Sequence, residues 1–333
     1  MAFFIRCWCE FMSVILSGMR PTGALHLGHY VGVIKNWVAL QEQYQCFFFV
    51  ADWHAMTSNY DSVKVIHESR REYVRGWLAC GVDPKKAIIY NQSDMPEVLF
   101  LDRVFLCLTP PGWADRSPSW KDLSVNPNKR LDNLGFYTYP ILQAADIAIV
   151  HGEFVPVGED QVTHVEISRE IVRKFNRTYG ANLPEPQPKL TAVPKLLGTD
   201  GKKMSSSIGN VITLRETEKS LQKKINGMKT DDLRNGIENP GNPDNCSVFD
   251  YHKIFSPSDL VSEVSEACKG AKLGCGECKQ KLGACMKLEL IPIAEKMNMI
   301  TDAECDQVLA DGNKVASEII KKNWNELRQK VGL

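Results

Sequence analysis

The stretch Met19-Arg-Pro-Thr-Gly-Ala-Leu-His-Leu-Gly-His-Tyr30 decides the fold, because it joins two different hydrophobic patterns. An apolar run at residues 14–17 precedes it and is typical of a buried strand. Apolar side chains at helical spacing begin near Leu27 and continue to Leu40. The sequence therefore predicts a strand, a glycine-containing turn and a helix start, whose free backbone N–H groups and positive dipole end favour phosphate.

His26 and His29 are three residues apart and share one face of the predicted helical turn. Two imidazole donors beside a helix start suit a polyphosphate whose charge grows in a transition state. Gly28 lies between them and carries no side chain, so a flat ring such as adenine could approach the backbone. Histidines near a helix start also occur as plain polar surface or as a metal site, and this stretch alone leaves all three interpretations open.

Strand and helix patterns alternate along the first third of the chain, which predicts an α/β fold with a parallel sheet. Two further apolar runs are typical of strands covered on both faces, and they lie at residues 46–51 and 87–90. Helical spacing covers residues 61–79 and 97–108. Ligands of such sheets bind at the carboxyl ends of the strands. We therefore expect the site to be formed by residues 18–26, 52–54 and 91–93.

The middle of the chain is less regular. Residues 109–135 are rich in Pro, Asp, Asn and Lys, which predicts a long loop or a mobile insertion, with a plain surface connection as the alternative. A helix, a short strand and a second helix are predicted at residues 139–150, 154–157 and 159–175. Residues 181–203 are rich in Pro and Gly, and from about residue 212 the pattern is mostly helical.

Length and composition are those of a globular protein that is large enough for two domains. The chain has 333 residues, 24% charged residues and a formal net charge of zero, so any nucleic-acid contact must come from local patches. No apolar run approaches the roughly 20 residues that a membrane helix needs, and residues 1–11 lack the features of a signal peptide. We expect a cytoplasmic protein that begins in effect at Met12, after a disordered or misassigned leader over residues 1–12.

A second motif, Gly201-Lys-Lys-Met-Ser-Ser-Ser-Ile-Gly-Asn210, follows the middle of the chain. His-Leu-Gly-His near the start and Lys-Met-Ser-Ser-Ser after the middle, in this order, resemble the HIGH and KMSKS signatures of class I aminoacyl-tRNA synthetases. Three further blocks are similar to bacterial-type tryptophanyl-tRNA synthetases, and they lie at residues 49–57, 139–147 and 155–161. The similarity runs from about residue 14 to the C-terminus.

The resemblance implies a Rossmann-like catalytic domain at residues 13–211, which could include the C-terminal helix, and a helical anticodon-binding domain at residues 212–333. It also implies activation of L-tryptophan with Mg²⁺ and ATP, followed by transfer to the terminal 2′-hydroxyl of tRNA(Trp), in a homodimer. In-line attack at phosphorus needs positioning and charge neutralisation more than a protein base. The catalytic residues it assigns are His26, His29, Lys202 and Lys203.

The resemblance assigns the remaining site residues to two substrates. The ATP site would comprise Arg20, Pro21, Thr22, Gly28, His29, Gly158, Glu159, Asp160, Val193, Lys203, Met204, Ser205, Ser206 and Ser207. The tryptophan site would comprise His54, Tyr139, Asp146, Val155, Val157 and Gln161. Asp146 matches the carboxylate that reads the indole N–H, and an unpaired buried acceptor there would reject amino acids that lack this donor. Without the resemblance, Asp146 would be taken for a helix-surface carboxylate.

Three positions depart from the family pattern. Ser206 replaces the second lysine of KMSKS, Gln143 stands where much of the family has Met, and Arg20 stands where many members have Gln. A cation lost near pyrophosphate should weaken transition-state stabilisation unless Lys202 compensates. Ser206 leaves open a synthetase-like regulatory protein without catalysis. The sequence also leaves open a nucleotidyltransferase that acts on another substrate, and a synthetase that is specific for tyrosine.

Four of the eleven cysteines form a spaced set, Cys246-x21-Cys268-x6-Cys275-x2-Cys278. Four cysteines whose spacing ends in CxxC indicate a metal site. Zinc is the default occupant, and an iron–sulfur cluster is the alternative. The spacing is similar to a subset of tryptophanyl-tRNA synthetases with a [4Fe–4S] cluster, and this resemblance favours the cluster over Zn²⁺ and over unligated thiols. Its expected role is to brace the tRNA-binding end.

Overall fold

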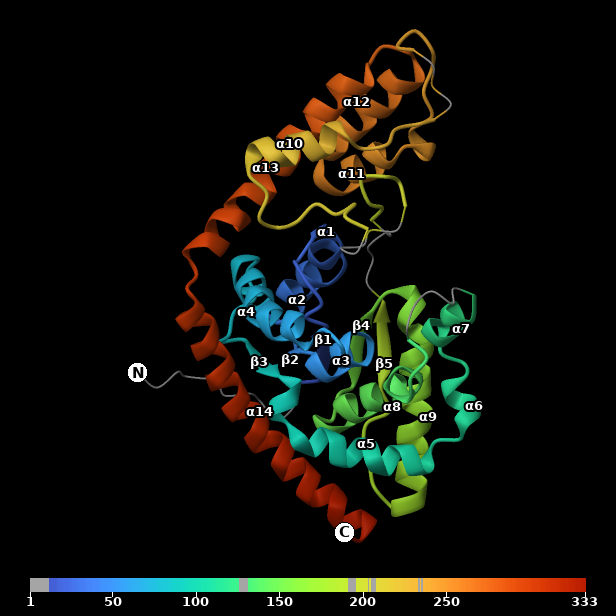
Figure 1. The fold of residues 1–333 in the computed structure, drawn as a ribbon, viewed down its shortest axis with the longest axis vertical. Coiled ribbons are helices and arrows are strands. Elements are labelled where there is room, and N and C mark those ends of the chain that lie inside the picture. The colour runs from blue at the N-terminus through green and yellow to red at the C-terminus, as the bar shows by residue number, and fades with distance from the viewer. Residues whose placement is uncertain are drawn as a thin grey trace. The chain divides into compact units, whose positions relative to one another are not determined.

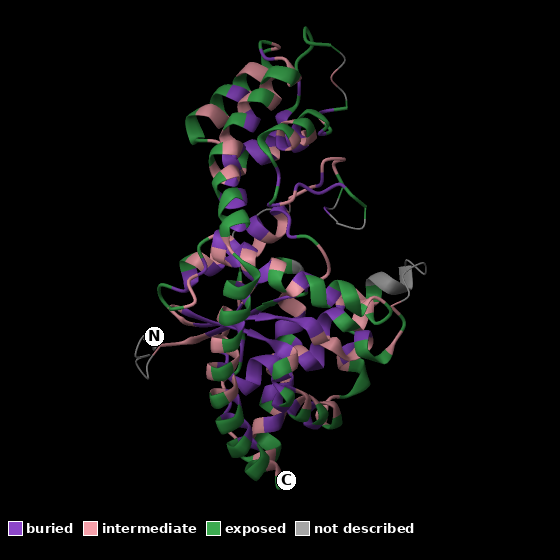
Figure 2. Ribbon diagram, turned by 60° about the vertical axis from the view of Figure 1, so that its left-hand side comes forward, coloured by how far each residue is buried: buried purple, intermediate pink, exposed green. Residues whose placement is uncertain are grey.

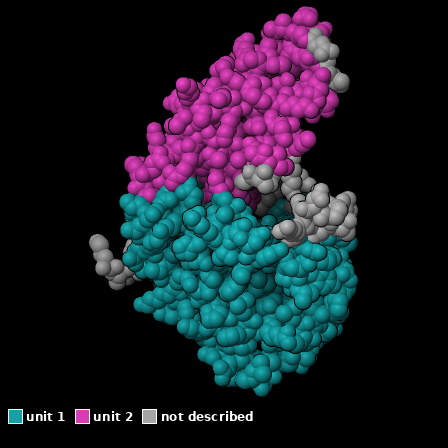
Figure 3. All heavy atoms as spheres, viewed as in Figure 1, with its two compact units in different colours: residues 1–23, 35–192, 301–333 teal, residues 24–34, 193–300 magenta. Residues whose placement is uncertain are grey.

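The computed structural model describes residues 12–125, 131–190, 196–202, 204, 208–232, 234 and 236–333, except for the side chains of residues 122–125 and 160. The chain packs as two compact units, which Figure 3 colours separately. Unit 1 comprises Met1–Gly23, Lys35–Ala192 and Thr301–Leu333, and unit 2 comprises Ala24–Ile34 and Val193–Ile300. The predicted leader at residues 1–12 lies, apart from Met12, outside the described residues.

Unit 1 is built on a parallel sheet of five strands in the order β3-β2-β1-β4-β5. The strands are β1 (Val14–Met19), β2 (Gln45–Val50), β3 (Ala87–Asn91), β4 (Phe154–Val157) and β5 (Gln187–Leu190). This order has the strand reversal at β1 and β4 that characterises doubly wound nucleotide-binding sheets, whose ligands bind at the carboxyl ends of the strands. The predicted α/β fold is confirmed, and Figure 1 shows the strands surrounded by helices.

The three phenylalanines of β2 show why this strand is apolar throughout. Phe47 and Phe49 point into a core shared with Tyr90 and with helices that follow β3 and β4. Phe48 points to the opposite face and stacks on Trp37, with ring centroids 4.2 Å apart. Since both faces of the sheet are covered, the alternation of strand side chains requires an unbroken apolar run, and Figure 2 shows the strands buried.

The helices of unit 1 cover the sheet and connect its strands. They are α2 (Lys35–Leu40), α3 (Asp52–Asn59), α4 (Val63–Ala79), α5 (Pro96–Leu108), α6 (Pro111–Ala114), α7 (Pro118–Val125), α8 (Leu134–Ile149), α9 (Val162–Tyr179) and α14 (Asp302–Val331), with two 3₁₀ turns, η2 (Gln92–Asp94) and η3 (Glu159–Gln161). The prediction of a long loop over residues 109–135 was wrong in part, because α6 and α7 lie within this segment. Both helices begin at a proline, a residue that suits the first helical position.

Helix α14 contacts the edge strand β3. Asn313 on this helix accepts a hydrogen bond from the backbone N–H of Asn91 (2.8 Å) and donates one to Asp94 (2.5 Å). The neighbouring Gly312 packs so closely that a Cβ atom would lie 1.8 Å from the carbonyl oxygen of Ile89. Glycine and asparagine therefore allow the helix to cover a strand edge that would otherwise expose unpaired backbone groups.

Replacing Gly312 by alanine is expected to lower the free energy of unfolding by about 3 kcal/mol, at the upper end of overpacking effects, because backbone must move to admit the methyl group. Chemical denaturation of the full chain measures this loss. Gly112→Ala in α6 is the matched control, since a Cβ there meets no atom within 4 Å. Equal stability of the two variants would contradict the close approach of α14 to β3.

The regular secondary structure of unit 2 is helical among its described residues, and an isolated bridge pairs His26 with Thr213. Its longer helices are α10 (Glu218–Asn226), α11 (Ser247–Phe255), α12 (Ser258–Lys269) and α13 (Cys275–Met299), and its shorter ones are α1 (Leu27–His29), the π-helix η1 (Tyr30–Ile34) and the 3₁₀ turn η4 (Pro243–Asn245). Phe249, Val264 and Leu273 form a small core against which Cys246 and Cys278 pack. Among the described residues, no helix is long and apolar enough to cross a membrane.

Candidate active site

His26 and His29 are joined in a capping arrangement at the start of the helical run. His26 is the N-cap of α1, and its Nδ1 accepts a hydrogen bond from the backbone N–H of Gly28 (3.1 Å). Nδ1 of His29 accepts from the backbone N–H of His26 (3.3 Å). The two rings lie 3.9 Å apart. Since each Nδ1 is an acceptor, each neutral ring carries its proton on Nε2, where it can act as a donor.

His26 is buried, and this burial lowers its pKa from 6.5 to about 4. The imidazole is therefore neutral at pH 7. It can offer a hydrogen-bond donor but no formal charge to a ligand. Gly28 is required by the same packing, because a Cβ there would lie 2.9 Å from the His26 ring. Glycine in this motif thus makes room for a histidine ring, in addition to any approach of a ligand.

The stability of the protein is expected to fall as the pH decreases from 6.5 to about 4. In this window an unfolded His26 binds more protons than a folded one, so this residue alone costs up to about 1.4 kcal/mol per pH unit. Urea denaturation at pH 7 and pH 5 measures the slope. His26→Asn keeps a capping acceptor but removes the titrating ring, and should flatten the slope. An unchanged slope would contradict the burial of a neutral His26.

The structure brings the two signature motifs together within unit 2. Backbone hydrogen bonds pair residues 25–27 with residues 212–214, just after the second motif. Met204 of that motif is buried, and its sulfur lies 3.5 Å from the position of a Gly28 Cβ. Asp200 shapes the turn by accepting from the backbone of Lys202 (3.0 Å) and from Asn210 (2.8 Å). Lys202 is exposed.

Five predicted ATP-site residues are not described by the structure. Val193, Lys203, Ser205, Ser206 and Ser207 lie outside the described residues, as does the side chain of Asp160. Five other predicted members directly follow the carboxyl ends of the central strands. Arg20, Pro21 and Thr22 come after β1, and Gly158 and Glu159 come after β4, where Gly158 caps the turn η3.

Asp146 is the centre of a buried polar cluster in unit 1. It lies on α8 and is 1% exposed. Its Oδ2 accepts from Nε2 of His54 on α3 (2.8 Å), and both of its oxygens accept from the side-chain amide of Gln92 (2.9 and 2.8 Å). This burial contradicts the surface carboxylate that the sequence alone would favour. The hydrogen bond between His54 and Asp146 brings two predicted tryptophan-site residues into direct contact.

The charge state of Asp146 reflects opposing effects. Burial raises its pKa, and the hydrogen bonds from His54 and Gln92 act in the opposite direction. The nearby Asp52 adds a smaller upward effect on the pKa of Asp146. Asp52 is itself buried and is balanced by Arg70, whose Nη2 lies 2.5 Å from its Oδ2. The site thus keeps an acceptor in an apolar setting by surrounding it with fixed donors.

Tyr139 and Gln161, the predicted ligands of the α-amino group, are linked through His164. The hydroxyl of Tyr139 lies 2.8 Å from Nε2 of His164, and Oε1 of Gln161 lies 2.7 Å from Nδ1 of the same ring. Ser119 also contacts the Tyr139 hydroxyl (3.0 Å). The ring of Tyr139 lies 6.1 Å from that of His54, edge to face. The structure therefore gathers four of the six predicted tryptophan-site residues.

Val155 and Val157 are buried on the same face of β4, in the core that also contains α8. Gln92 and His164, both 0% exposed, contact these predicted residues, and neither was assigned a role of its own from the sequence. Each had a signal in the sequence. Gln92 falls in the segment 91–93 that follows β3, and His164 comes one helical turn after Gln161.

The four spaced cysteines are all described and all lie in unit 2. Burial is the main cause that raises the pKa of Cys278, to about 12, and the other three thiols raise it further. The guanidinium of Arg234 lies 4.0 Å from Sγ of Cys268 and 3.8 Å from Sγ of Cys275. Among the residues that the structure describes, no three His, Cys, Asp or Glu side chains are arranged to hold a metal ion.

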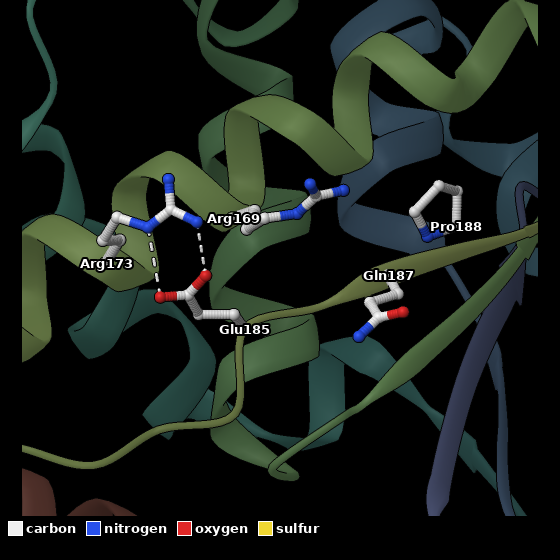
Figure 4. A pocket seen from close by; sticks show the side chains of 5 residues that line it. All are labelled: Arg169, Arg173, Glu185, Gln187 and Pro188. Carbon is white, nitrogen blue, oxygen red and sulfur yellow. Dashed lines mark hydrogen bonds and ion pairs between the residues drawn. The ribbon is translucent and has the colours of Figure 1, made fainter.

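A cavity of about 400 Å³ lies elsewhere in unit 1 and contains no predicted site residue. Figure 4 shows its lining, which consists of Arg169, Arg173, Glu185, Gln187 and Pro188. Arg173 forms a two-pronged ion pair with Glu185 (3.1 and 2.5 Å). The cavity lies at the beginning of β5, whereas ligands of parallel sheets bind at the strand ends. It is therefore separate from the predicted nucleotide site.

Comparison with known proteins identifies the family. Residues 12–289 match the model of class I tRNA synthetases (W and Y). The tryptophan–tRNA ligase of Thermotoga maritima is 47% identical over 324 residues, which covers 96% of this chain and 99% of the relative. The ligase of Aquifex aeolicus is 38% identical over 392 residues, which covers 96% of this chain and 99% of the relative.

Solved structures agree with this assignment. The crystal structure of tryptophanyl-tRNA synthetase from Campylobacter jejuni, complexed with ADP and tryptophan, has a TM-score of 0.83 and is 34% identical. The match covers 96% of this chain and 100% of that chain. A chain with this sheet, these two motifs and relatives at this coverage belongs to the tryptophanyl-tRNA synthetases, the class I tryptophan–tRNA ligases.

Proposed function

We propose that the polar cluster around Asp146 selects tryptophan and that the paired motifs of unit 2 act on ATP. Tryptophan binds with its indole N–H to Asp146, its ring against His54, Val155 and Val157, and its amino group at Tyr139 and Gln161. Its carboxylate attacks the α-phosphate of Mg²⁺-bound ATP and releases pyrophosphate. The 2′-hydroxyl of the terminal adenosine of tRNA(Trp) then takes the tryptophanyl group from the adenylate.

One observation carries this assignment. Asp146 is a buried carboxylate with fixed donors on one side, Gln92 and His54, and Oδ1 accepts from only one of the described residues. A carboxylate oxygen can accept about two hydrogen bonds, so Oδ1 keeps room for one more donor. An indole ring with its single N–H matches an apolar site with one remaining acceptor position.

In the proposed chemistry the protein positions groups and neutralises charge. His26 and His29 donate from Nε2 to the phosphates, while Lys202 and Lys203 supply positive charge. The turn at Arg20, Pro21 and Thr22 also neutralises phosphate charge through its backbone amides, and Lys203, Met204, Ser205, Ser206 and Ser207 lie over the phosphates. Gly158, Glu159 and Asp160 hold the ribose hydroxyls of ATP, and adenine approaches Gly28 and Val193. Closure of the loop around Met204 would exclude water from the reacting groups.

Pyrophosphate exchange with each of the twenty amino acids, on protein purified without oxygen, tests this function. Exchange that depends on tryptophan alone supports both the adenylation step and the role of Asp146 in selection. Exchange with tyrosine would overturn the selection by Asp146. Exchange with none would favour a regulatory protein without catalysis, and Ser206→Lys should then restore activity if the missing lysine is the cause.

We also propose that Cys246, Cys268, Cys275 and Cys278 hold a [4Fe–4S] cluster, in preference to Zn²⁺. Three observations support this fit. The four thiols influence one another electrostatically, the charge of Arg234 lies beside two of them, and Gly241 approaches Cys268 so closely that a Cβ would lie 2.6 Å from its sulfur. Four thiolates give a zinc site and a [4Fe–4S] cluster alike a net negative charge that suits the nearby guanidinium, and the cysteine spacing is what favours the cluster. When bound, it would brace the end of the enzyme that contacts the tRNA anticodon, in a homodimer acting in the cytoplasm.

Cys275→Ser is expected to abolish iron binding and weaken the affinity for tRNA(Trp), while adenylation stays within about twofold of wild type. Iron and acid-labile sulfide in anaerobically purified protein, together with filter binding of the tRNA, measure the two effects. Cys285→Ser is the matched control, since this cysteine lies on α13 outside the spaced set. Zinc without iron in the wild-type protein would overturn the cluster.

A further inference from the structure

Gln92 is the most completely buried polar side chain next to Asp146, and the assigned roles do not use it. It is 0% exposed and lies directly after β3, at the edge of the sheet where ligands bind. Its Oε1 accepts from the backbone N–H groups of Trp53 (3.1 Å) and His54 (3.4 Å) at the start of α3. Its Nε2 donates to both oxygens of Asp146.

These partners fix the orientation of the amide. Two backbone N–H groups can be satisfied only by the oxygen, so the nitrogen must face the carboxylate. The same interactions tie together three elements, because Gln92 follows β3, its oxygen holds α3, and its nitrogen holds α8. Oδ2 of Asp146 receives donors from both Gln92 and His54, whereas Oδ1 receives a donor from Gln92 alone among the described residues.

The surroundings of Asp146 explain why such a donor matters. Asp52 at the start of α3 and Asp102 on α5 are further acids that interact electrostatically with Asp146, and Tyr90 on β3 adds a buried hydroxyl. Burial raises the pKa of Asp102 to about 6, with a further contribution from Asp146. His54 and Gln92 are the groups that counteract this acidic, apolar environment at Asp146.

We propose that Gln92 is a positioning residue for tryptophan selection: its amide keeps the Asp146 carboxylate ionised and oriented, and leaves Oδ1 as the acceptor for the indole N–H. This inference rests on the proposed role of Asp146. Removing the amide from this buried network leaves the carboxylate with one fixed donor fewer and free to rotate. A hydrogen bond to a buried charged group contributes enough to change affinity by about 10- to 100-fold.

A purely structural role for Gln92 is the competing explanation, and the chain offers a matched control for it. Gln41 is also buried, and it also bridges two backbone groups: its Nε2 donates to the carbonyl of Gly81 (3.0 Å) and its Oε1 accepts from Asp83 (2.9 Å). Neither of these two partners is a predicted site residue. Gln92→Met and Gln41→Met therefore remove the same chemical group from two comparable settings.

The experiment compares Gln92→Met, Gln41→Met and Asp146→Asn in pyrophosphate exchange with tryptophan and with its benzothiophene analogue, which lacks the N–H. Gln92→Met should raise the KM for tryptophan about 10- to 100-fold with little change in the KM for ATP, and it should reduce discrimination against the analogue by a similar factor. Gln41→Met should change the KM for tryptophan and the discrimination against the analogue by less than about twofold each.

The outcomes separate this inference from the proposed function. If Asp146→Asn no longer discriminates between tryptophan and the analogue but Gln92→Met still does, the role of Gln92 is overturned and that of Asp146 stands. If neither variant changes discrimination, the role of Asp146 fails and the inference fails with it.

Gln92→Glu provides a second readout should the Met variant not fold. It keeps the acceptor for α3 but places an oxygen against Asp146, so the two carboxyls share protons. Tryptophan binding should then weaken as the pH rises through the apparent pKa of the pair, unlike in the wild type. A pH profile identical to that of the wild type would overturn the proposal.

Discussion

Replacing Asp146 by alanine is expected to lower kcat/KM for tryptophan at least about 10³-fold in pyrophosphate exchange. The substitution removes the acceptor for the indole N–H, and it also leaves the donors of His54 and Gln92 without their buried partner. Sites that are built to hydrogen-bond a substrate lose this much when the partner is missing, because buried polar groups are left unpaired.

The KM for ATP separates this loss from general unfolding, and it should stay within a few-fold of wild type. Asp311→Ala on α14 is a control carboxylate, since it accepts a hydrogen bond from Gln307 (2.9 Å) near the surface, one turn earlier on the same helix. A fall in kcat/KM of less than tenfold for Asp146→Ala would argue that another group reads the indole.

The second large effect is expected at His29. His29→Asn should reduce the rate of pyrophosphate exchange about 10²- to 10³-fold, while tryptophan binding by equilibrium dialysis stays unchanged. Asparagine can still accept from the backbone of His26 as Nδ1 does now (3.3 Å), but it lacks the N–H at Nε2 that would face the phosphates. Losing one donor to developing charge costs about this factor in other enzymes.

His67→Asn serves as the control, because His67 lies exposed on α4. It should leave exchange and binding unchanged. If His29→Asn lowers tryptophan binding and the exchange rate equally, the residue supports the ground state as much as the transition state, and its assignment as catalytic would be wrong.

The parts of the fold that the sequence predicted are those with strong local patterns. The three consecutive phenylalanines of β2 require cover on both faces, and Trp37 and Tyr90 provide it. β5 was missed because Gln187–Leu190 is short, begins with a polar residue and contains a proline, and its pairing with β4 is decided by tertiary contacts.

The candidate site likewise contains residues that could be assigned before the structure and residues that could not. The resemblance supplied His54 and Asp146, and the structure places them 2.8 Å apart. Gln92 and His164 could not be assigned from the sequence, since their function depends on partners that lie distant along the chain or in neighbouring elements. Asp146 and Gln92 are separated by 54 positions, and only the packing of α8 against the sheet edge brings them together. Neutralisation of His26 by burial is likewise a tertiary effect that no local motif encodes.

The covering of β3 by α14 has a consequence for synthesis on the ribosome. The strand is complete by residue 91, but the helix that covers its edge starts only at Asp302. Until then the edge is open, and an open edge can pair with another nascent chain. The catalytic sheet thus gains this protection from aggregation only once Gly312 and Asn313 have been synthesised and can dock on β3.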